Sequence, residues 1–178
     1  GRLNNVSPER RQGFDYWNIL PGQGNYYNPD FIEMGVKKRF EGYVTSLTTK
    51  FALGWLDKRD RSKPFCLMLH HKAPHRNWLP EEKYLDLYED REFPFPDNFF
   101  DDYSGRGTAA RKQEMEIVRD MMWGHDMKFD KFPFNTRNTE NLGFDLDRLN
   151  ESQKTAWREA YNRRNEEFIK NNPQGKEL

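Results

Sequence analysis

The chain has 178 residues, a length consistent with one domain. Its 29 lysines and arginines balance its 29 aspartates and glutamates, so no net charge attracts nucleic acid or an anionic membrane surface. No apolar run approaches the roughly 18 residues that a membrane-spanning helix needs, and no signal peptide is apparent. We therefore expect neither nucleic acid nor a membrane among the partners of the chain.

The composition is unusual for a free-standing domain. Hydrophobic residues make up 35% of the chain, charged residues 33%, and the mean hydropathy is -1.12. Little apolar surface is thus available to offset the conformational entropy lost on folding. Aromatic residues nevertheless reach 15%, which argues against disorder. Two interpretations fit, an extended segment that packs on a partner or a piece of a larger enzyme, and we favour the second.

The first 41 residues carry several prolines and glycines without sustained periodicity, which predicts loops with short extended pieces. Within them, residues 21–29 read Pro-Gly-Gln-Gly-Asn-Tyr-Tyr-Asn-Pro, so aromatics and amides sit on a flexible backbone. Such a segment is either a sugar-binding loop or an ordinary packed loop. The second is the commoner case, because most loops are simply connections.

From residue 43 to about residue 59 the apolar side chains follow a helical spacing. Val44, Leu47, Phe51 and Trp55 recur at intervals of three and four, which places them on one stripe facing a core. A run of charges at residues 57–63 then ends the helix and turns the chain toward a strand. This order predicts a helix-then-strand unit of a parallel sheet.

Residues 65–69 are five consecutive apolar residues, the pattern of a strand buried on both faces. The one cysteine, Cys66, lies in this run and is expected to be a small buried hydrophobe without an intrachain disulfide. Three of the four histidines, with Lys72 and Arg76, follow at residues 70–76. Open α/β sheets bind ligands beyond the carboxyl ends of their strands. The cluster is therefore either a binding site or a basic surface turn.

The second half alternates helical and irregular patterns. Proline and acids at residues 80–82 predict a short helix to about residue 90, and residues 93–100 alternate proline with phenylalanine and predict an extended wall. Residues 108–123 are expected to be helical, with Met115, Val118 and Met122 facing a core.

A last helix is predicted to begin at Asn150, with Gln153 in the capping-box position. Trp157, Tyr161 and Phe168 would form its apolar face. The sequence Asn-Asn-Pro at residues 171–173 ends it. Neither an internal repeat nor a low-complexity linker divides the chain.

Four motifs, in order, resemble the sulfatase family of the alkaline-phosphatase-like superfamily. They are Gly-Phe-Asp-Tyr-Trp at residues 13–17, Gly-Tyr-Val-Thr at residues 42–45, the Lys-Pro-Phe strand at residues 63–69 leading to Ala-Pro-His at 73–75, and Asp-Asp-Tyr-Ser-Gly-Arg at 101–106. The resemblance covers most of residues 13–178. It is closest to the branch that acts on N-acetylglucosamine-6-sulfate in mucin and heparan-type glycans.

The resemblance implies an α/β fold, a fragment of an alkaline-phosphatase-like mixed sheet flanked by helices, in which residues 1–178 form a single partial domain from the middle of a catalytic domain. It implies a hydrolase that uses a formylglycine nucleophile, made in a Cys/Ser-x-Pro-x-Arg motif, and a calcium ion. Neither that motif nor the calcium ligands are present here, and Cys66 is followed by Leu-Met-Leu. We therefore expect the remaining segments of the domain to be required as partners, and these 178 residues alone to be inactive. A periplasmic or extracellular location is implied.

By the same resemblance, His75 is the catalytic residue, which contacts the sulfate and protonates the leaving oxygen. A histidine suits this role because imidazole gains and loses a proton near neutral pH. We expect His71, Lys72, Arg76 and Trp78 to bind the sulfated glycan substrate, with Trp78 stacking on a sugar ring. Neighbouring strand residues point to opposite faces, so His70 and His71 cannot both face the site. We choose His71, because it shares its face with Leu69.

Three alternatives remain open. His71 and His75 could share a metal with a distant carboxylate, although Pro74 opposes the helix that such a pair would favour. The chain could be a non-catalytic glycan-binding module that uses its aromatic loops. It could also belong to a phosphatase or phosphodiesterase of the same superfamily. We assign no metal ligand within the chain.

Overall fold

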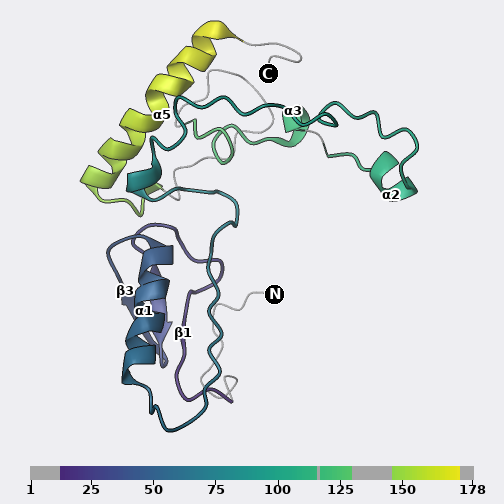
Figure 1. Ribbon diagram of the computed structural model, residues 1–178. Helices are drawn as coiled ribbons and strands as arrows, with labels where there is room; N and C mark the ends of the chain where they lie inside the picture. The colour runs from purple at the N-terminus through teal and green to yellow at the C-terminus, as the bar shows by residue number, and fades with distance from the viewer. Residues whose placement is uncertain (1–12, 116, 130–145, 173–178) are drawn as a thin grey trace.

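A computed structural model describes residues 13–115, 117–129 and 146–172. A small sheet of strands β1 (Asn18–Ile19), β2 (Asp30–Glu33) and β3 (Val36–Arg39) lies beside helix α1 (Val44–Lys58) at one end of the molecule (Figure 1). Helix α5 (Glu151–Asn171) lies at the other end. Between them in sequence come a 3-10 helix (Glu82–Tyr84) and two short helices, α2 (Thr108–Arg111) and α3 (Ile117–Asp120).

The sheet is antiparallel throughout, in the order β1-β2-β3. A two-residue turn joins β2 to β3, and both of its residues, Met34 and Gly35, have positive φ angles of 47° and 92°. Such turns match the right-handed twist of paired strands. The prediction of short extended pieces is confirmed, but the sequence Met-Gly gives little sign of this turn, since Asn-Gly and Asp-Gly are its usual signals.

Helix α1 confirms the predicted stripe. Val44 is fully buried, Leu47 and Phe51 pack against the core, and Trp55 is half-buried. The Phe51 ring meets the ring of Phe31 on β2 edge to face, with centroids 5.0 Å apart. The apolar face of α1 is therefore what holds the small sheet in place.

The core of the molecule runs from the sheet into α5. Tyr26 and Tyr27, at 2% and 3% exposure, share one cluster with Leu146, Leu149 and Trp157 of the C-terminal part. Residues 21–29 are thus a packed loop, as the commoner of the two interpretations predicts. A sugar-binding role for these two tyrosines is wrong, because rings this deeply buried offer no face to a ligand.

Helix α5 begins as predicted, with a complete capping box. The Asn150 side chain accepts from the Gln153 main-chain N–H at 2.9 Å, and the Gln153 side chain accepts from the Asn150 N–H at 2.9 Å. Trp157 is buried at 1% exposure and stacks at a tilt on Tyr161. The helix ends at Asn171, and Asn172 adopts the left-handed conformation that commonly closes helices.

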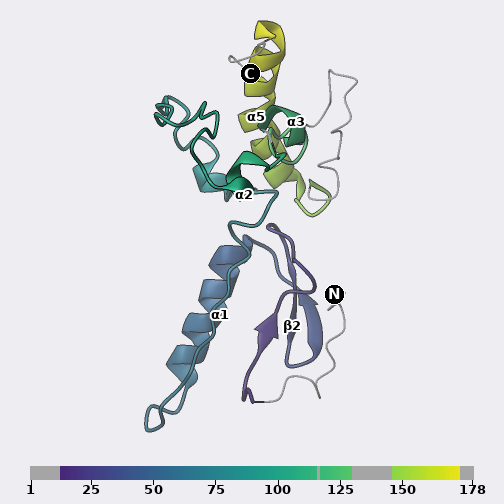
Figure 2. The ribbon, with the colours of Figure 1, turned by 90° about the vertical axis from the view of Figure 1, so that its right-hand side faces the viewer.

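Residues 65–69 correct one prediction. They run back along α1 as an extended segment (Figure 2) but pair with no strand in the part of the chain that the structure describes. Phe65 and Met68 are 50% and 58% exposed, and Cys66 is exposed rather than buried. The described sheet is antiparallel, with β1 and β3 paired to the two sides of β2, so the expected parallel unit does not form within the described residues.

The predicted helix at residues 108–123 is also wrong. In the described part of this stretch only α2 and α3 are helical, and Met115 between them is 78% exposed. The side chain of Val118 lies outside the described residues. Helices this short gain little without packing, and three spaced apolar residues do not supply it. The short helix predicted to about residue 90 is likewise reduced to one 3-10 turn, because Leu85 is the one residue of this stretch that is buried.

The extended wall predicted for residues 93–100 is wrong in its second half. Residues 93–96 are not helical, as their prolines predict, but residues 97–100 form turns. Their phenylalanines are exposed and contact one another, with the Phe95 and Phe99 rings 4.6 Å apart. Among the described helices, none combines the length and apolarity that crossing a membrane requires.

Candidate functional site

The predicted catalytic residue lies in a compact turn after the extended segment. The His75 main-chain N–H donates to the Lys72 carbonyl oxygen at 2.9 Å, and the Trp78 N–H donates to the His75 carbonyl oxygen at 3.3 Å. The His75 side chain is exposed, and its Nδ1 lies 2.5 Å from the Arg76 carbonyl oxygen. Because a carbonyl oxygen only accepts, Nδ1 donates this bond, and Nε2 is the ring nitrogen that this contact leaves available.

Two buried tyrosines and one half-buried tyrosine hold the main chain of residues 75–80, called here the His75 loop. Three hydroxyls donate to its carbonyl oxygens: Tyr26 to His75 at 2.5 Å, Tyr27 to Pro80 at 2.5 Å, and Tyr43 to Leu79 at 2.8 Å. Burial raises the pKa of Tyr43 to about 12 and raises that of Tyr27 well above its ordinary value. Both hydroxyls therefore remain protonated donors over the working pH range of a protein.

A charge pair joins the His75 loop to the segment before residue 130. Nε of Arg76 donates to Asp126 at 2.7 Å, and a second guanidinium nitrogen bonds the other carboxylate oxygen. The Met122 N–H donates to the same carboxylate at 2.7 Å. Burial works to raise the pKa of Asp126, but these donors outweigh it, so the pKa lies below its ordinary value. Arg76 is thus fixed in place by an ionised partner.

Lys128 secures the same loop through its main chain. This lysine is 4% exposed, and its ammonium group donates to the carbonyl oxygens of Asn77 and His125. The ammonium also lies 5.7 Å from the centre of the Trp78 ring, while the Arg76 guanidinium lies 6.0 Å from it. Trp78 itself is 47% exposed. Two cations therefore flank an aromatic ring whose surface is half available to a ligand.

The structure separates the predicted site residues into two groups. His71 and Lys72 line a cavity of about 610 Å³ between β1, α1 and the extended segment, together with His70. The residues around this cavity are mostly apolar, and His75, Arg76 and Trp78 are not among them. The strand alternation that favoured His71 over His70 does not apply, because neither residue lies in a ladder. Lys72 links the groups, since its ammonium lies 4.6 Å from the centre of the Tyr26 ring.

Sequence reasoning missed Asp126 and Lys128. They lie some 50 residues after the groups they bind, in a stretch without periodicity, and no local pattern marks a buried lysine. Within residues 13–115, 117–129 and 146–172, no three histidine, cysteine, aspartate or glutamate side chains gather as metal ligands. The described residues therefore do not fit a calcium site, nor one shared by His71 and His75.

Known proteins resemble this chain over nearly its whole length. It is 42% identical over 171 residues to the N-acetylglucosamine-6-O-sulfatase of Bacteroides thetaiotaomicron, which covers 94% of this chain. The chain is a homologue of the sulfatases. It spans about a third of that relative, 31% of its length. The human N-acetylglucosamine-6-sulfatase is 28% identical over 93 residues. This match covers 49% of this sulfatase homologue and 17% of the human protein.

A solved structure shares the fold. It is the protein BT4656 in complex with its substrate D-glucosamine-2-N,6-O-disulfate, and it matches 94% of this sulfatase homologue at a TM-score of 0.82 and 42% identity. The match covers 35% of the solved chain. No protein-family model matches. The predictions of the family and of an α/β, alkaline-phosphatase-like fold are confirmed, whereas the roles of His75, His71, Lys72, Arg76 and Trp78 stay predictions.

Proposed function

We propose that this sulfatase homologue is part of an enzyme that hydrolyses sulfate esters on glycans, at 6-O-sulfated N-acetylglucosamine of mucin or glycosaminoglycan. The observation that carries the proposal is the 42% identity to an N-acetylglucosamine-6-O-sulfatase over 94% of the chain. The fold it shares with a protein solved with a sulfated glucosamine substrate supports the same class of ligand.

The chemistry assigns His75 the role of general acid. Cleavage of a sulfate ester on a sugar expels an alkoxide, a poor leaving group that needs a proton as the bond breaks. Nε2 of His75 is exposed, while Nδ1 is engaged by the Arg76 carbonyl oxygen, which orients the ring. An imidazolium at this position gives its Nε2 proton to the leaving oxygen as the bond breaks, and the neutral imidazole then regains a proton from water.

Substrate binding falls to the residues around His75. Lys72 and Arg76 present positive charge to the anionic sulfate, and charged donors are the groups that stabilise such an anion. Because Asp126 already holds two donors of Arg76, this arginine orients the substrate more than it adds net charge. The exposed part of Trp78 offers a face for a pyranose ring, and His71 lies toward the cavity side.

The nucleophile and the metal are assigned to segments outside these 178 residues. The formylglycine motif is absent from the sequence, and the described residues gather no calcium ligands. The partners proposed are therefore the sulfated glycan and the remaining segments of the same catalytic domain. A periplasmic or extracellular location, where such glycans are met, is part of the proposal.

The glycan-binding module is the weaker alternative. It relies on aromatic loops, and the tyrosines of residues 21–29 are buried in the core. A phosphatase or phosphodiesterase of the same superfamily is the other alternative. The curated relatives are sulfatases, which favours sulfate esters as the substrate.

The test measures sulfate release from N-acetylglucosamine-6-sulfate by the full-length protein, its His75→Ala variant and the 178 residues alone. We expect release by the full-length protein, a loss of about 10²- to 10⁴-fold in His75→Ala, the usual contribution of a general acid, and no release by the 178 residues alone. Lys38→Ala on the exposed strand β3 is the control, because Lys38 lies outside both the cavity and the His75 loop, and it should retain full activity. A full-length protein that binds sulfated sugars but releases no sulfate would refute the proposal in favour of a binding module.

A further inference from the structure

The tyrosines beneath the His75 loop form one rigid unit. The Tyr43 ring lies 5.9 Å from that of Tyr26 and 5.5 Å from that of Tyr27. The Val44 main-chain N–H donates to the Tyr26 carbonyl oxygen at 2.8 Å, and Tyr27 and Tyr43 form an antiparallel bridge. This unit therefore starts α1 and packs in the core at the same time.

Of the three hydroxyls, that of Tyr26 acts on the predicted acid itself. It reaches the His75 carbonyl oxygen at 2.5 Å from a residue 49 positions earlier in the chain. Tyr26 is 2% exposed, whereas His75 is exposed. A core side chain thus fixes the main chain from which a solvent-facing imidazole projects. Rigid support of this kind is what a catalytic group needs, because small displacements from the productive geometry are costly.

We infer that Tyr26 is a positioning residue for His75: its hydroxyl fixes the His75 main chain so that Nε2 faces the leaving oxygen of the sulfate ester. The inference rests on the proposed function. Tyr43 and Tyr27 extend the same support to the end of the loop through Leu79 and Pro80. The Arg76–Asp126 pair holds the loop independently.

Tyr26→Phe removes the hydroxyl and leaves the ring. The His75 carbonyl oxygen keeps the bond from the Trp78 N–H at 3.3 Å, so the turn retains a hydrogen bond and the variant is expected to fold. We expect Tyr26→Phe to lower kcat about tenfold, the effect of losing one hydrogen bond of ordinary strength that holds His75 in its productive geometry. KM should change less than about twofold, because the groups assigned to binding are untouched.

A double-mutant cycle separates positioning from general stability. The full-length protein, Tyr26→Phe, His75→Ala and the double variant are assayed on N-acetylglucosamine-6-sulfate. If Tyr26 acts through His75, its tenfold effect on kcat disappears when His75 is alanine, because nothing remains to be positioned. An equal loss in both backgrounds, or no loss in either, overturns the inference.

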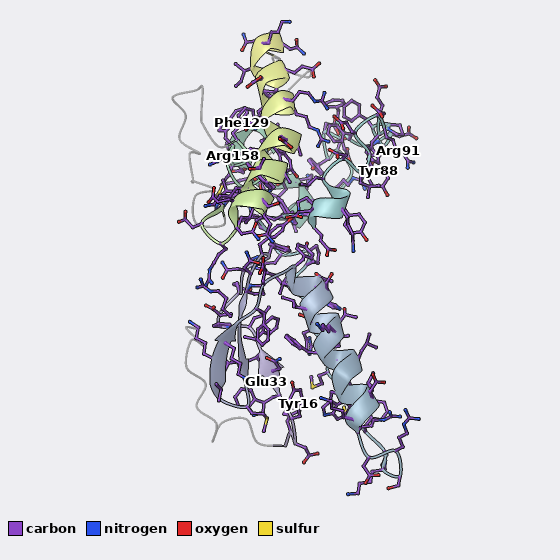
Figure 3. All side chains as sticks on the ribbon, turned by 90° about the vertical axis from the view of Figure 1, so that its left-hand side faces the viewer. Tyr16, Glu33, Tyr88, Arg91, Phe129 and Arg158 are labelled. Atoms are coloured by element: carbon purple, nitrogen blue, oxygen red, sulfur yellow. The ribbon has the colours of Figure 1, made fainter. Side chains whose placement is uncertain are left out.

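Tyr16→Phe is the matched control. Its hydroxyl donates to Glu33 at 2.8 Å, and both residues lie in the part of the molecule that holds the sheet, away from α5 (Figure 3). This variant should leave kcat unchanged in both backgrounds. If Tyr26→Phe does not fold, Tyr43→Phe takes its place. It should lower kcat about threefold, and this effect should again disappear when His75 is alanine. Absence of sulfate release from the unmutated full-length protein would instead refute the proposed function itself.

Discussion

Asn28 joins three parts of the chain, and its replacement tests the account of the core. Its side chain amide donates to the Arg148 carbonyl oxygen at 2.6 Å and to the Gln153 side chain at 2.8 Å. Its side-chain oxygen accepts from the Gly42 N–H at 2.8 Å. Asn28 also has a positive φ of 44° and is 8% exposed. The sheet end, the start of α1 and the start of α5 therefore meet at one buried amide.

Asn28→Ala removes these three hydrogen bonds at about 1 kcal/mol each and places alanine in the left-handed region at about 1 kcal/mol more. We expect the free energy of unfolding of the full-length protein to fall by about 4 kcal/mol. Asn28→Gly loses the same bonds without the backbone cost, so it should be about 1 kcal/mol less destabilised than Asn28→Ala.

Urea unfolding followed by circular dichroism measures both variants against the unmutated protein. A loss below about 1 kcal/mol in Asn28→Ala would refute the reasoning, because the three bonds would then contribute nothing net. Equal losses in the alanine and glycine variants would refute the assignment of part of the cost to the positive φ.

Two further predictions concern strand β2 and the loop that precedes it. Hydrogen bonding from Arg148 holds the pKa of Asp30 far below its ordinary value despite burial. The stabilisation by the ionised Asp30 is therefore complete above a pH of about 4 and is lost as the pH falls below that. Asp30→Asn should remove this part of the acid dependence of unfolding midpoints measured from pH 2 to 7, and an unchanged acid dependence would contradict the prediction. Gly24 has a φ of 67°, and an added Cβ would lie 2.9 Å from the Leu20 side chain. Gly24→Ala should therefore lower the free energy of unfolding by about 1 to 3 kcal/mol, whereas Gly107→Ala should not, because the space around Gly107 is open. Similar melting temperatures for the two variants would contradict the steric argument.

The extended segment at residues 65–69 shows how much a strand depends on its neighbours. Five apolar residues in succession predict a buried strand, yet Phe65 and Met68 are half exposed and pair with no described strand. A strand exists only when another strand supplies its hydrogen bonds. Apolar character marks a segment that favours burial, but where it is buried depends on the neighbours that the fold provides.

The sequence by itself determined the elements whose signals are local. The stripe from Val44 to Trp55 predicts α1, and Asn150 with Gln153 predicts the start of α5, because helical spacing and capping involve residues three or four apart. The four motifs that end at residues 17, 45, 75 and 106 also identified the family, since the order of short motifs is itself a property of the sequence.

The tertiary structure decided how the candidate site is held. The hydroxyl of Tyr26 reaches His75 across 49 residues, and Asp126 reaches Arg76 across 50. Nothing in the spacing of these residues links them, because such contacts depend on where the core brings distant segments together. Chemistry that resides in one side chain is therefore readable from the sequence, whereas the geometry that orients it arises only when the chain is folded.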